Sequence, residues 1–408
     1  MNNSEFFVYC IQLVVIVFGF VYFEKKYRFL PISIFLSLSL LVGSIVLAML
    51  SAKVAELDSR KYLKDAILLT SFLDKDSSLY GLFFLTGGNG LYPQSYFPML
   101  IASNTWSNYT SYTIEKFYLF FALISKPNLY NISLFFGTLS FFSKTLLLKT
   151  LFHLDKNPVK LKLLCFFLMF GGLELYFVSG VYKENLLFLF VSFILFSLFT
   201  KPKTWKYILA FLCFIHAVFI RLDTMVIMML TGIGIYLLTE FKELEWKRYV
   251  LAFILPLIGI ICLYLSPYSD YVLRKLTRYS KLKMGNTHFD LIDWTTSYDV
   301  LFVQVLNRWK QAIFTLFTNL DYLWIVNLSG AITICFIIIL LLNQSKLWHK
   351  LSLFTSINFA AFILIISLFV PNYMALIRYR SPLLILFMFG LILNLDSRSR
   401  VLKIAGRL

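Results

Sequence analysis

Residues 206–240 read KYILAFLCFIHAVFIRLDTMVIMMLTGIGIYLLTE, an almost unbroken apolar stretch with basic residues at both ends. One long helix would place those ends on opposite membrane faces, whereas lysine and arginine collect on the cytoplasmic side. A hairpin turning at Arg221-Leu222-Asp223 keeps both ends on one side. Its first arm, 206–220, is about 22 Å long and too short for a full crossing, so we expect the turn below the outer surface, lining a cavity.

The composition of the whole chain is typical of a membrane protein with several spans. Of its 408 residues, 59% are hydrophobic and 14% are charged, and the mean hydropathy is +0.78. The net charge of +17 comes from short basic clusters between apolar runs, so it orients helices and does not indicate nucleic-acid binding. All five cysteines lie inside apolar runs, which indicates neither disulfides nor a thiolate metal site.

The apolar runs predict an all-α integral membrane protein, with one polytopic domain over residues 1–408. A helix of about 20 apolar residues crosses roughly 30 Å of hydrocarbon, and on this basis we expect about eleven transmembrane helices. They lie near residues 6–22, 30–50, 131–150, 162–180, 185–200, 206–220, 223–240, 249–266, 323–343, 351–370 and 382–395.

The orientation follows from the basic residues, which gather in every second connection between the expected helices. If that side is the cytoplasm, the amino terminus lies outside and the carboxyl terminus inside. Two large loops, about 51–130 and 267–322, then lie outside, and their short apolar stretches suit helices lying on the membrane surface. The basic and aromatic residues of the second loop suit either sugar rings and anionic groups or the lipid headgroups.

The same orientation gathers unusual charged residues on the outer face. An ionisable group at mid-bilayer costs about 2.5–3.5 kcal/mol, so such residues usually face a cavity or a partner. The residues are Asp58, Lys183, Glu184, Arg221, Asp223, Arg378 and Arg380.

The first outer loop contains a carboxylate and a tyrosine at helical spacing. Asp58 and Tyr62 are four residues apart and share a face if this segment is helical. Asp58 is suited to act as a general base toward a sugar hydroxyl, or alternatively to cap the following helix. His216, near the depth of Arg221, is either a hydrogen-bonded packing residue or a catalytic one.

A tight turn, Ser179-Gly180-Val181-Tyr182, leads into Lys183 and Glu184 at the start of a helix. Glu184 can cap this helix and pair with Lys183. Alternatively, Lys183 lies on the outer side because it binds a phosphate.

Two further groups have alternative interpretations. The sequence Arg378-Tyr379-Arg380 opens the last helix and suits a phosphate or pyrophosphate, or else anchors the helix at the interface. Glu174, inside the fourth helix, is either a protonated packing residue or the partner of a cation such as Lys183.

Taken in order, these motifs resemble a family. Asp-x-x-x-Tyr follows an early helix, Ser-Gly-x-x-Lys-Glu opens a middle helix, an arginine lies in the next hairpin, and Arg-Tyr-x-x-Pro opens a late helix. This order resembles bacterial polytopic polysaccharide polymerases, of the O-antigen and exopolysaccharide kind, and the related polyprenol-dependent glycosyltransferases of the GT-C type. Two departures are Leu222, where the family commonly has proline after the arginine, and the lack of a second acidic residue adjacent to Asp58.

The resemblance implies a GT-C-like fold and a glycosyltransferase of the bacterial inner membrane. Its substrate would be a sugar or oligosaccharide linked to undecaprenyl (pyro)phosphate, with no other cofactor, and its partners would be membrane lipids and other glycan-assembly proteins. The lack of a second acidic residue adjacent to Asp58 departs from the family and makes a reaction without a metal the expectation. By residue, the resemblance implies Asp58 as the base, Glu184 positioning Lys183 or an acceptor hydroxyl, and phosphate or substrate binding by Lys183, Arg221, Arg378, Arg380, Tyr379 and Tyr62. Asp223, His216 and Glu174 are secondary candidates.

The main alternative is a different class of protein: a flippase for lipid-linked oligosaccharides or a transporter of anionic substrates. Such a protein would also have arginines in a membrane cavity. The sequence shows no inverted repeat, and the charged residues singled out above lie at one face instead of the midplane. A third class is a receptor or assembly component without chemistry, for which replacing Asp58 would leave the product unchanged.

Overall fold

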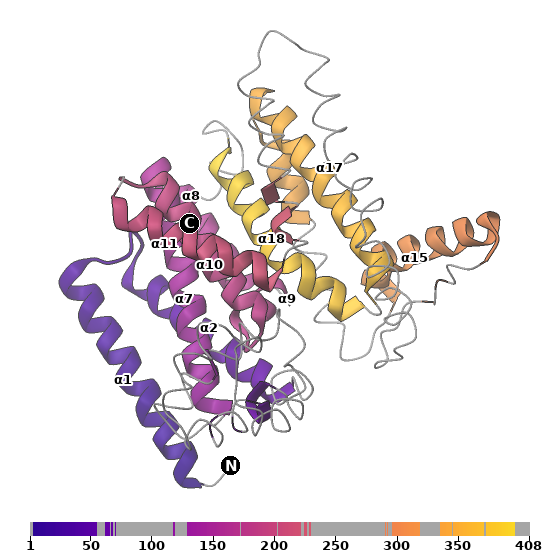
Figure 1. Cartoon of the computed structure of the whole chain (residues 1–408). Helices are drawn as coiled ribbons and strands as arrows, with labels where there is room; N and C mark the ends of the chain where they lie inside the picture. Colours follow the sequence, from indigo (N-terminus) through magenta and orange to yellow (C-terminus); the bar gives the residue numbers. More distant parts are fainter. Residues whose placement is uncertain are drawn as a thin grey trace. The chain divides into compact units, whose positions relative to one another are not determined.

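The described part of the chain is all helical (Figure 1). The computed structural model describes residues 3–54, 62–65, 67, 70, 117–118, 129–171, 173–201, 203–221, 224–226, 228–229, 290, 292, 296–318, 335–344, 346–370 and 373–395. These residues form helices and connecting turns without a strand, and one isolated bridge among them pairs Gln344 with Leu395. The predicted all-α class is confirmed.

The chain divides into two compact units. The first unit comprises Met1–Gly171 and Leu175–Leu222, and the second comprises Gly172–Glu174 and Asp223–Leu408. The boundary falls inside the short helix α9 (Leu173–Ser179). One polytopic domain over residues 1–408 stays a prediction, because two compact units can still fold as one domain.

The first unit is built around α7 (Leu129–Leu154), which packs against α2 (Ile34–Val54) and α10 (Lys183–Phe199). The approach of α7 to α2 is close, since a Cβ on Gly137 would lie 2.7 Å from the Cα of Ile45. Only glycine allows that separation. The other helices of this unit are α1 (Asn3–Tyr27), α8 (Pro158–Phe170) and α11 (Thr204–Ile220), which packs on α10.

Several helices have the length and surface of membrane spans. Large apolar side chains are exposed along α1, where Phe7 is 66% and Phe18 71% exposed, as expected of a helix surrounded by lipid. Four helices of the described part are long and apolar enough to cross a membrane: Phe7–Tyr27, Ile34–Ala52, Leu129–Leu154 and Ala375–Leu393. The chain therefore belongs to the membrane proteins, and the total of about eleven spans stays a prediction.

Part of the predicted helix pattern lies outside the described residues. This applies to the helix near 249–266 and to most of those near 223–240 and 323–343. The break predicted at Arg221 is confirmed, because α11 ends at Ile220 and helical structure resumes at Thr224. The reversal of chain direction at this break stays a prediction.

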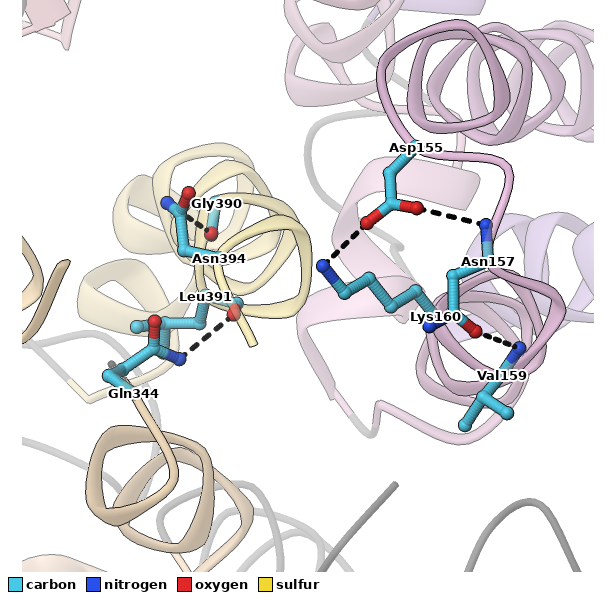
Figure 2. A network of polar contacts seen from close by, with 8 residues as sticks. All are labelled: Asp155, Asn157, Val159, Lys160, Gln344, Gly390, Leu391 and Asn394. Carbon is cyan, nitrogen blue, oxygen red and sulfur yellow. Dashed lines mark hydrogen bonds and ion pairs between the residues drawn. The ribbon is translucent and has the colours of Figure 1, made fainter. Parts of the chain in front are cut away.

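The connection from α7 to α8 is held by local polar contacts (Figure 2). The side chain of Asn157 accepts a hydrogen bond from the Val159 amide at 2.9 Å and caps α8, whose first residue is Pro158. Proline suits this position because the first amides of a helix have no partner inside it. Asp155 accepts hydrogen bonds from the Asn157 amide at 3.0 Å and from Lys160 Nζ at 2.6 Å.

The single helix predicted near 162–180 is wrong, because the chain forms α8 and α9 there. Helix α8 ends at Phe170, and the amide of Gly171 donates to the Phe167 carbonyl at 2.8 Å. Two successive glycines follow the last turn of α8, and glycine is the residue that most often ends a helix. The break makes Glu174 a residue of the first turn of α9 instead of the interior of a long helix.

The second unit contains α15 (Tyr298–Thr318), α17 (Lys346–Phe369) and α18 (Tyr373–Leu393), which pack on one another. The predicted start of the last helix at 382 is wrong by about two and a half turns, since α18 begins at Tyr373. The Arg378–Arg380 segment therefore lies within the helix, and Pro382 lies inside it as well. Membrane helices tolerate an internal proline where neighbouring groups satisfy the freed backbone.

Helix α15 falls in the second predicted outer loop and has two different faces. On one, Trp309 Nε1 donates to the Leu364 carbonyl of α17 at 3.1 Å. On another, Val303 is exposed. This pattern agrees with the surface-lying helix predicted for the loop, although its position in the membrane stays a prediction. Beside α18, Gln344 Nε2 donates to the Leu391 carbonyl at 3.0 Å (Figure 2).

Candidate functional site

The turn between α9 and α10 is held in place by groups from other parts of the first unit. The Val181 amide donates to Ser51 Oγ of α2 at 3.0 Å, and the Tyr118 hydroxyl donates to the Val181 carbonyl at 3.0 Å. Asn185 Nδ2 donates to the carbonyls of Phe136, in α7, at 2.9 Å and of Gly180 at 3.0 Å. These bonds fix where α10 begins, and therefore fix the position of its first residues.

Gly180 permits this arrangement because α2 passes directly beside the turn. A Cβ at this position would lie 2.7 Å from Ser51 Oγ and 2.7 Å from the Tyr182 ring. Any larger residue would push the turn away from Ser51 and break the Val181 hydrogen bond. The glycine of the predicted Ser-Gly-x-x-Lys-Glu motif therefore has a packing role.

A buried ion pair joins the start of α10 to the end of α11. Arg221 Nη2 lies 2.6 Å from Glu184 Oε1, and both side chains are buried. Glu184 is in the first turn of α10, where the helix dipole favours an anion, and Arg221 is the C-cap residue of α11, where it favours a cation. The sequence therefore places each charge at the helix end that stabilises it.

This pair changes the predicted roles of both residues. The acidic side chain was expected to cap α10 or to pair with Lys183, but the N-cap residue is Tyr182 and the ion pair of Glu184 is with Arg221. Arg221, predicted as a phosphate ligand, already has a carboxylate at its guanidinium. Lys183 is half-buried at the first position of α10.

A lysine that our sequence analysis did not single out lies in the middle of α7. Lys144 is buried, and its Nζ donates to Ser44 Oγ of α2 at 2.8 Å and to Ser179 Oγ of α9 at 2.9 Å. Ser140 Oγ also donates to Ser179 Oγ at 2.9 Å. Among the described residues no carboxylate lies within ion-pair distance of this amine.

The signal for Lys144 was present in the sequence as a basic residue inside an apolar run. Our reading of basic residues considered the connections between helices, where they set orientation. A lysine within a span is instead a functional candidate by default, because lipid does not solvate its charge. Only the fold shows that serines of two other helices accept its hydrogen bonds.

A second buried pair lies in the second unit. Arg380 of α18 donates to Glu174 Oε1 of α9 through Nε at 3.2 Å and through Nη2 at 2.8 Å. The predicted pairing of Glu174 with a cation is therefore confirmed, but the cation is Arg380 and not Lys183, the example given. Sequence spacing does not reveal this, because the two residues are 206 positions apart.

Two other predicted residues pack inside the first unit. His216 Nδ1 lies 2.8 Å from the Leu212 carbonyl, and its ring centroid is 5.8 Å from that of Phe190, which matches the packing alternative. The buried Tyr62 ring lies 5.9 Å from the ring of Tyr118, which binds the α9–α10 turn. Tyr62 therefore contacts the residue that binds the α9–α10 turn, but no described contact joins it directly to Glu184.

The other candidates are not joined to these pairs by the described contacts. Arg378 and Tyr379 are half-buried in α18. Asp58 and Asp223 lie outside the described residues, so the predicted base at Asp58 stays a prediction. In the part of the chain that the structure describes, no group of three histidine, cysteine or acidic residues is placed to hold a metal ion.

Comparisons of this chain with protein-family models, curated proteins and solved structures find no match. The classification therefore rests on the chain itself. It is a membrane protein whose described part is all helical, and each of its two compact units contains a buried arginine–glutamate pair.

Proposed function

We propose that this protein is a bacterial membrane glycosyltransferase that joins polyprenyl-(pyro)phosphate-linked sugars or repeat units on the outer face of the inner membrane. The fold we propose is GT-C-like with about eleven spans, since most of the apolar runs are long enough for a crossing helix. The observation that carries the proposal is the buried Glu184–Arg221 pair on the turn with the Ser-Gly-x-x-Lys-Glu motif.

The burial of this ion pair is better explained by a function than by a purely stabilising role. Removing two charges from water costs several kcal/mol per ion, roughly what their attraction returns, so apolar residues of similar size would stabilise the fold as well. The turn is also positioned by four hydrogen bonds from Ser51, Tyr118 and Asn185. Such support is expected where side chains must be held for binding or chemistry.

The chemistry of the proposed reaction matches these groups. The oxygen of an acceptor hydroxyl forms a bond to the anomeric carbon of the donor sugar. The bond from that carbon to the phosphate oxygen breaks, and the polyprenyl (pyro)phosphate leaves with the electron pair. Cations stabilise the charge that develops on this leaving group, and a carboxylate accepts the proton of the hydroxyl.

We assign the residues as follows. Asp58 accepts the proton, and Glu184 holds Arg221 in its orientation. Arginine has five N–H donors, so a contact with Glu184 through Nη2 is compatible with a phosphate contact through other donors. In the same unit, Lys183 and Tyr62 supply further phosphate and substrate contacts. The predicted substrate-binding roles of Arg378, Tyr379 and Arg380, in the second unit, stay predictions.

One observation favours the alternative of a flippase or anion transporter. Lys144 is a buried cation in the middle of a candidate span, whereas our sequence analysis found the charges at one face only. Intramembrane lysines often mark a substrate or ion pathway. The two functions differ in their products, because a flippase moves lipid-linked units and does not join them.

The test is a comparison of three variants in cells that lack their own copy of the gene: Glu184→Gln, Arg221→Gln and the double variant. Each single change removes the partner of one buried charge in this ion pair, whereas the double change removes both charges and is expected to fold better than either single change. If the pair serves the reaction, all three variants lose the polymer ladder of the surface glycan, and single lipid-linked units accumulate outside. Asp155→Asn, which removes an ion pair at the α7–α8 connection, is the control and keeps the ladder.

The outcomes separate the three classes. A full ladder from the folded double variant would show that the pair is structural and would remove the support for the proposal. Lipid-linked units retained on the cytoplasmic side would indicate a flippase. An unchanged ladder in cells without any copy of the protein would exclude both and leave a component without this chemistry.

A further inference from the structure

Two helices of the first unit contact the α9–α10 turn and its flanks through residues at regular helical spacing. On α2, Ser44 and Ser51 are seven residues apart and therefore lie on one face. On α7, Phe136, Ser140 and Lys144 follow one another at intervals of four residues and also share a face. All five residues are buried. The turn is therefore surrounded by one face of each helix.

The two ends of this turn are bound by different groups. After the turn, Asn185 Nδ2 donates to a carbonyl of α7 at 2.9 Å. Before it, the last residue of α9 is Ser179, whose Oγ accepts from Lys144 Nζ and from Ser140 Oγ, each at 2.9 Å. Lys144 Nζ also donates to Ser44 Oγ of α2 at 2.8 Å. Lys144 therefore joins α2, α7 and α9 at the place where the turn begins.

The turn leads directly to the buried ion pair of the candidate site. Glu184 follows Ser179 by five residues, and its Oε1 lies 2.6 Å from Arg221 Nη2. All three residues belong to the same compact unit as Lys144. A shift of Ser179 would move the start of α10, because the few residues between them form a short, tightly bound turn. The position of Ser179 therefore helps to determine the position of the ion pair.

The hydrogen bonds of the two serines indicate that Lys144 is not required for the stability of the fold. Ser44 Oγ also donates to the Leu40 carbonyl at 2.8 Å, and Ser179 Oγ also accepts from Ser140. Lys144→Met would fill similar space and leave neither hydroxyl without a partner. Burying an amine against neutral hydroxyls inside a membrane helix, in contrast, costs free energy. Stability alone would therefore favour an apolar residue here, and the lysine has another role.

We propose that Lys144 is a positioning residue: its amine holds Ser179 and thereby fixes the turn that places Glu184 and Arg221 for the transfer reaction. This inference rests on the proposed function. Lys144 touches no reacting atom in this role and acts through the turn. Its contribution to the rate is large nonetheless, because a misplacement of about 1 Å can slow a reaction about hundredfold.

The test compares Lys144→Met with the matched control Lys206→Met, each purified in nanodiscs. Lys206 is also a buried lysine of the first unit, but its amine bonds to Thr200 and to the Lys201 carbonyl at the other end of α10. Three properties are measured: hydrogen exchange of the backbone amides in the α9–α10 turn, thermal unfolding, and the kinetics of sugar transfer. The substrate is the lipid-linked repeat unit isolated from the same cells.

For Lys144→Met we expect a looser turn in a fold that is no less stable. The amides of the turn should exchange about three- to tenfold faster, the effect of one lost hydrogen bond on local opening. The midpoint of thermal unfolding should equal or exceed that of the wild type. The value of kcat should fall about ten- to hundredfold with little change in KM, because positioning is lost while substrate contacts remain. Lys206→Met should leave kcat and exchange in the turn unchanged.

The outcomes distinguish this inference from the function on which it rests. Unchanged exchange in the turn of Lys144→Met would refute the inference, and so would a looser turn with the kcat of the wild type. If the wild type transfers no sugar, the proposed function fails, while the exchange measurement still decides whether Lys144 holds the turn. Should Lys144→Met fail to fold, Ser179→Ala removes the same hydrogen bond from its other side, and unchanged exchange or kcat in that variant would equally refute it.

Discussion

Two ion pairs of the first unit have the same nitrogen–oxygen distance, 2.6 Å. One lies in the interior of the unit, and the other lies at the α7–α8 connection. Glu184 and Arg221 come from different helices and are buried, whereas Asp155 and Lys160 are five residues apart and the Asp155 side chain is 32% exposed. Equal distances therefore do not mean equal energies. In the interior, losing either partner leaves a charge that water does not reach, whereas at the α7–α8 connection only Lys160 is buried and Asp155 is partly solvated.

The largest effect is expected in the interior pair. Glu184→Gln should lower the free energy of unfolding by about 3–5 kcal/mol, because Arg221 then stays buried without its anion. Glu184→Gln with Arg221→Gln should recover most of this loss. The measurement is thermal unfolding of the purified variants in one detergent. A single variant as stable as the wild type would mean that water reaches Arg221.

A smaller effect is expected where α2 and α7 touch. Gly137→Ala should cost about 1–3 kcal/mol, because its Cβ would overlap the backbone of Ile45 and the helices must move apart. Gly43→Ala in α2 is the control, since a Cβ there meets nothing within 4 Å. It should be neutral or should stabilise the helix by up to about 1 kcal/mol. Equal stabilities of these two variants would contradict the close packing of α2 on α7.

The smallest effect is expected at the α7–α8 connection. Burial alone would raise the pKa of the Asp155 carboxyl, but the hydrogen bonds from Lys160 and the Asn157 amide, with the charge of Lys160, lower it below its usual value. A lowered pKa means that this carboxylate stabilises the fold above the pKa of an unfolded aspartate, about 3.9, and that the contribution is lost as the pH falls through the lowered value. We expect Asp155→Asn to cost about 1 kcal/mol at neutral pH, less than Glu184→Gln, because the asparagine oxygen can still accept the hydrogen bond of the buried Lys160.

The pH dependence supplies the measurement for this last prediction. The stability difference between Asp155→Asn and the wild type should be constant near neutral pH and should shrink as the medium becomes acidic. A difference that grows on acidification would mean that the carboxyl pKa is raised in the fold. High salt should also weaken this pair more than the Glu184–Arg221 pair, because only exposed charges are effectively screened.

The helical class was predictable because each backbone group in lipid must be satisfied within its own segment, which makes long apolar runs helical. The break at Arg221 was predictable for a related reason, since the placement of basic residues allowed only a turn there. The split of the 162–180 segment was missed, although Gly171 and Gly172 signalled it. The early start of α18 was missed because Pro382 was taken as a helix start, and membrane helices also accept proline in their interior.

For the candidate site, the sequence was a better guide to which charged residues are unusual than to the partners of those residues. Glu184, Arg221, Glu174 and Arg380 were all recognised as unusual, because charges in apolar surroundings are costly. Their pairing was not predictable, since Glu184 and Arg221 are 37 positions apart and Glu174 and Arg380 are 206 apart. Lys144 was missed because its importance depends on the serines of other helices.

By itself, the sequence determined that this protein is helical, that it belongs in a membrane, and that a few charged residues inside it require partners. These properties depend on local composition and on the cost of moving backbone and charge out of water. Only the tertiary structure decided which partners those charges have: Arg221 for Glu184, Arg380 for Glu174 and two serine hydroxyls for Lys144. The reason is that an ion pair or hydrogen bond depends on distances of a few ångströms, and these are set by how whole helices pack.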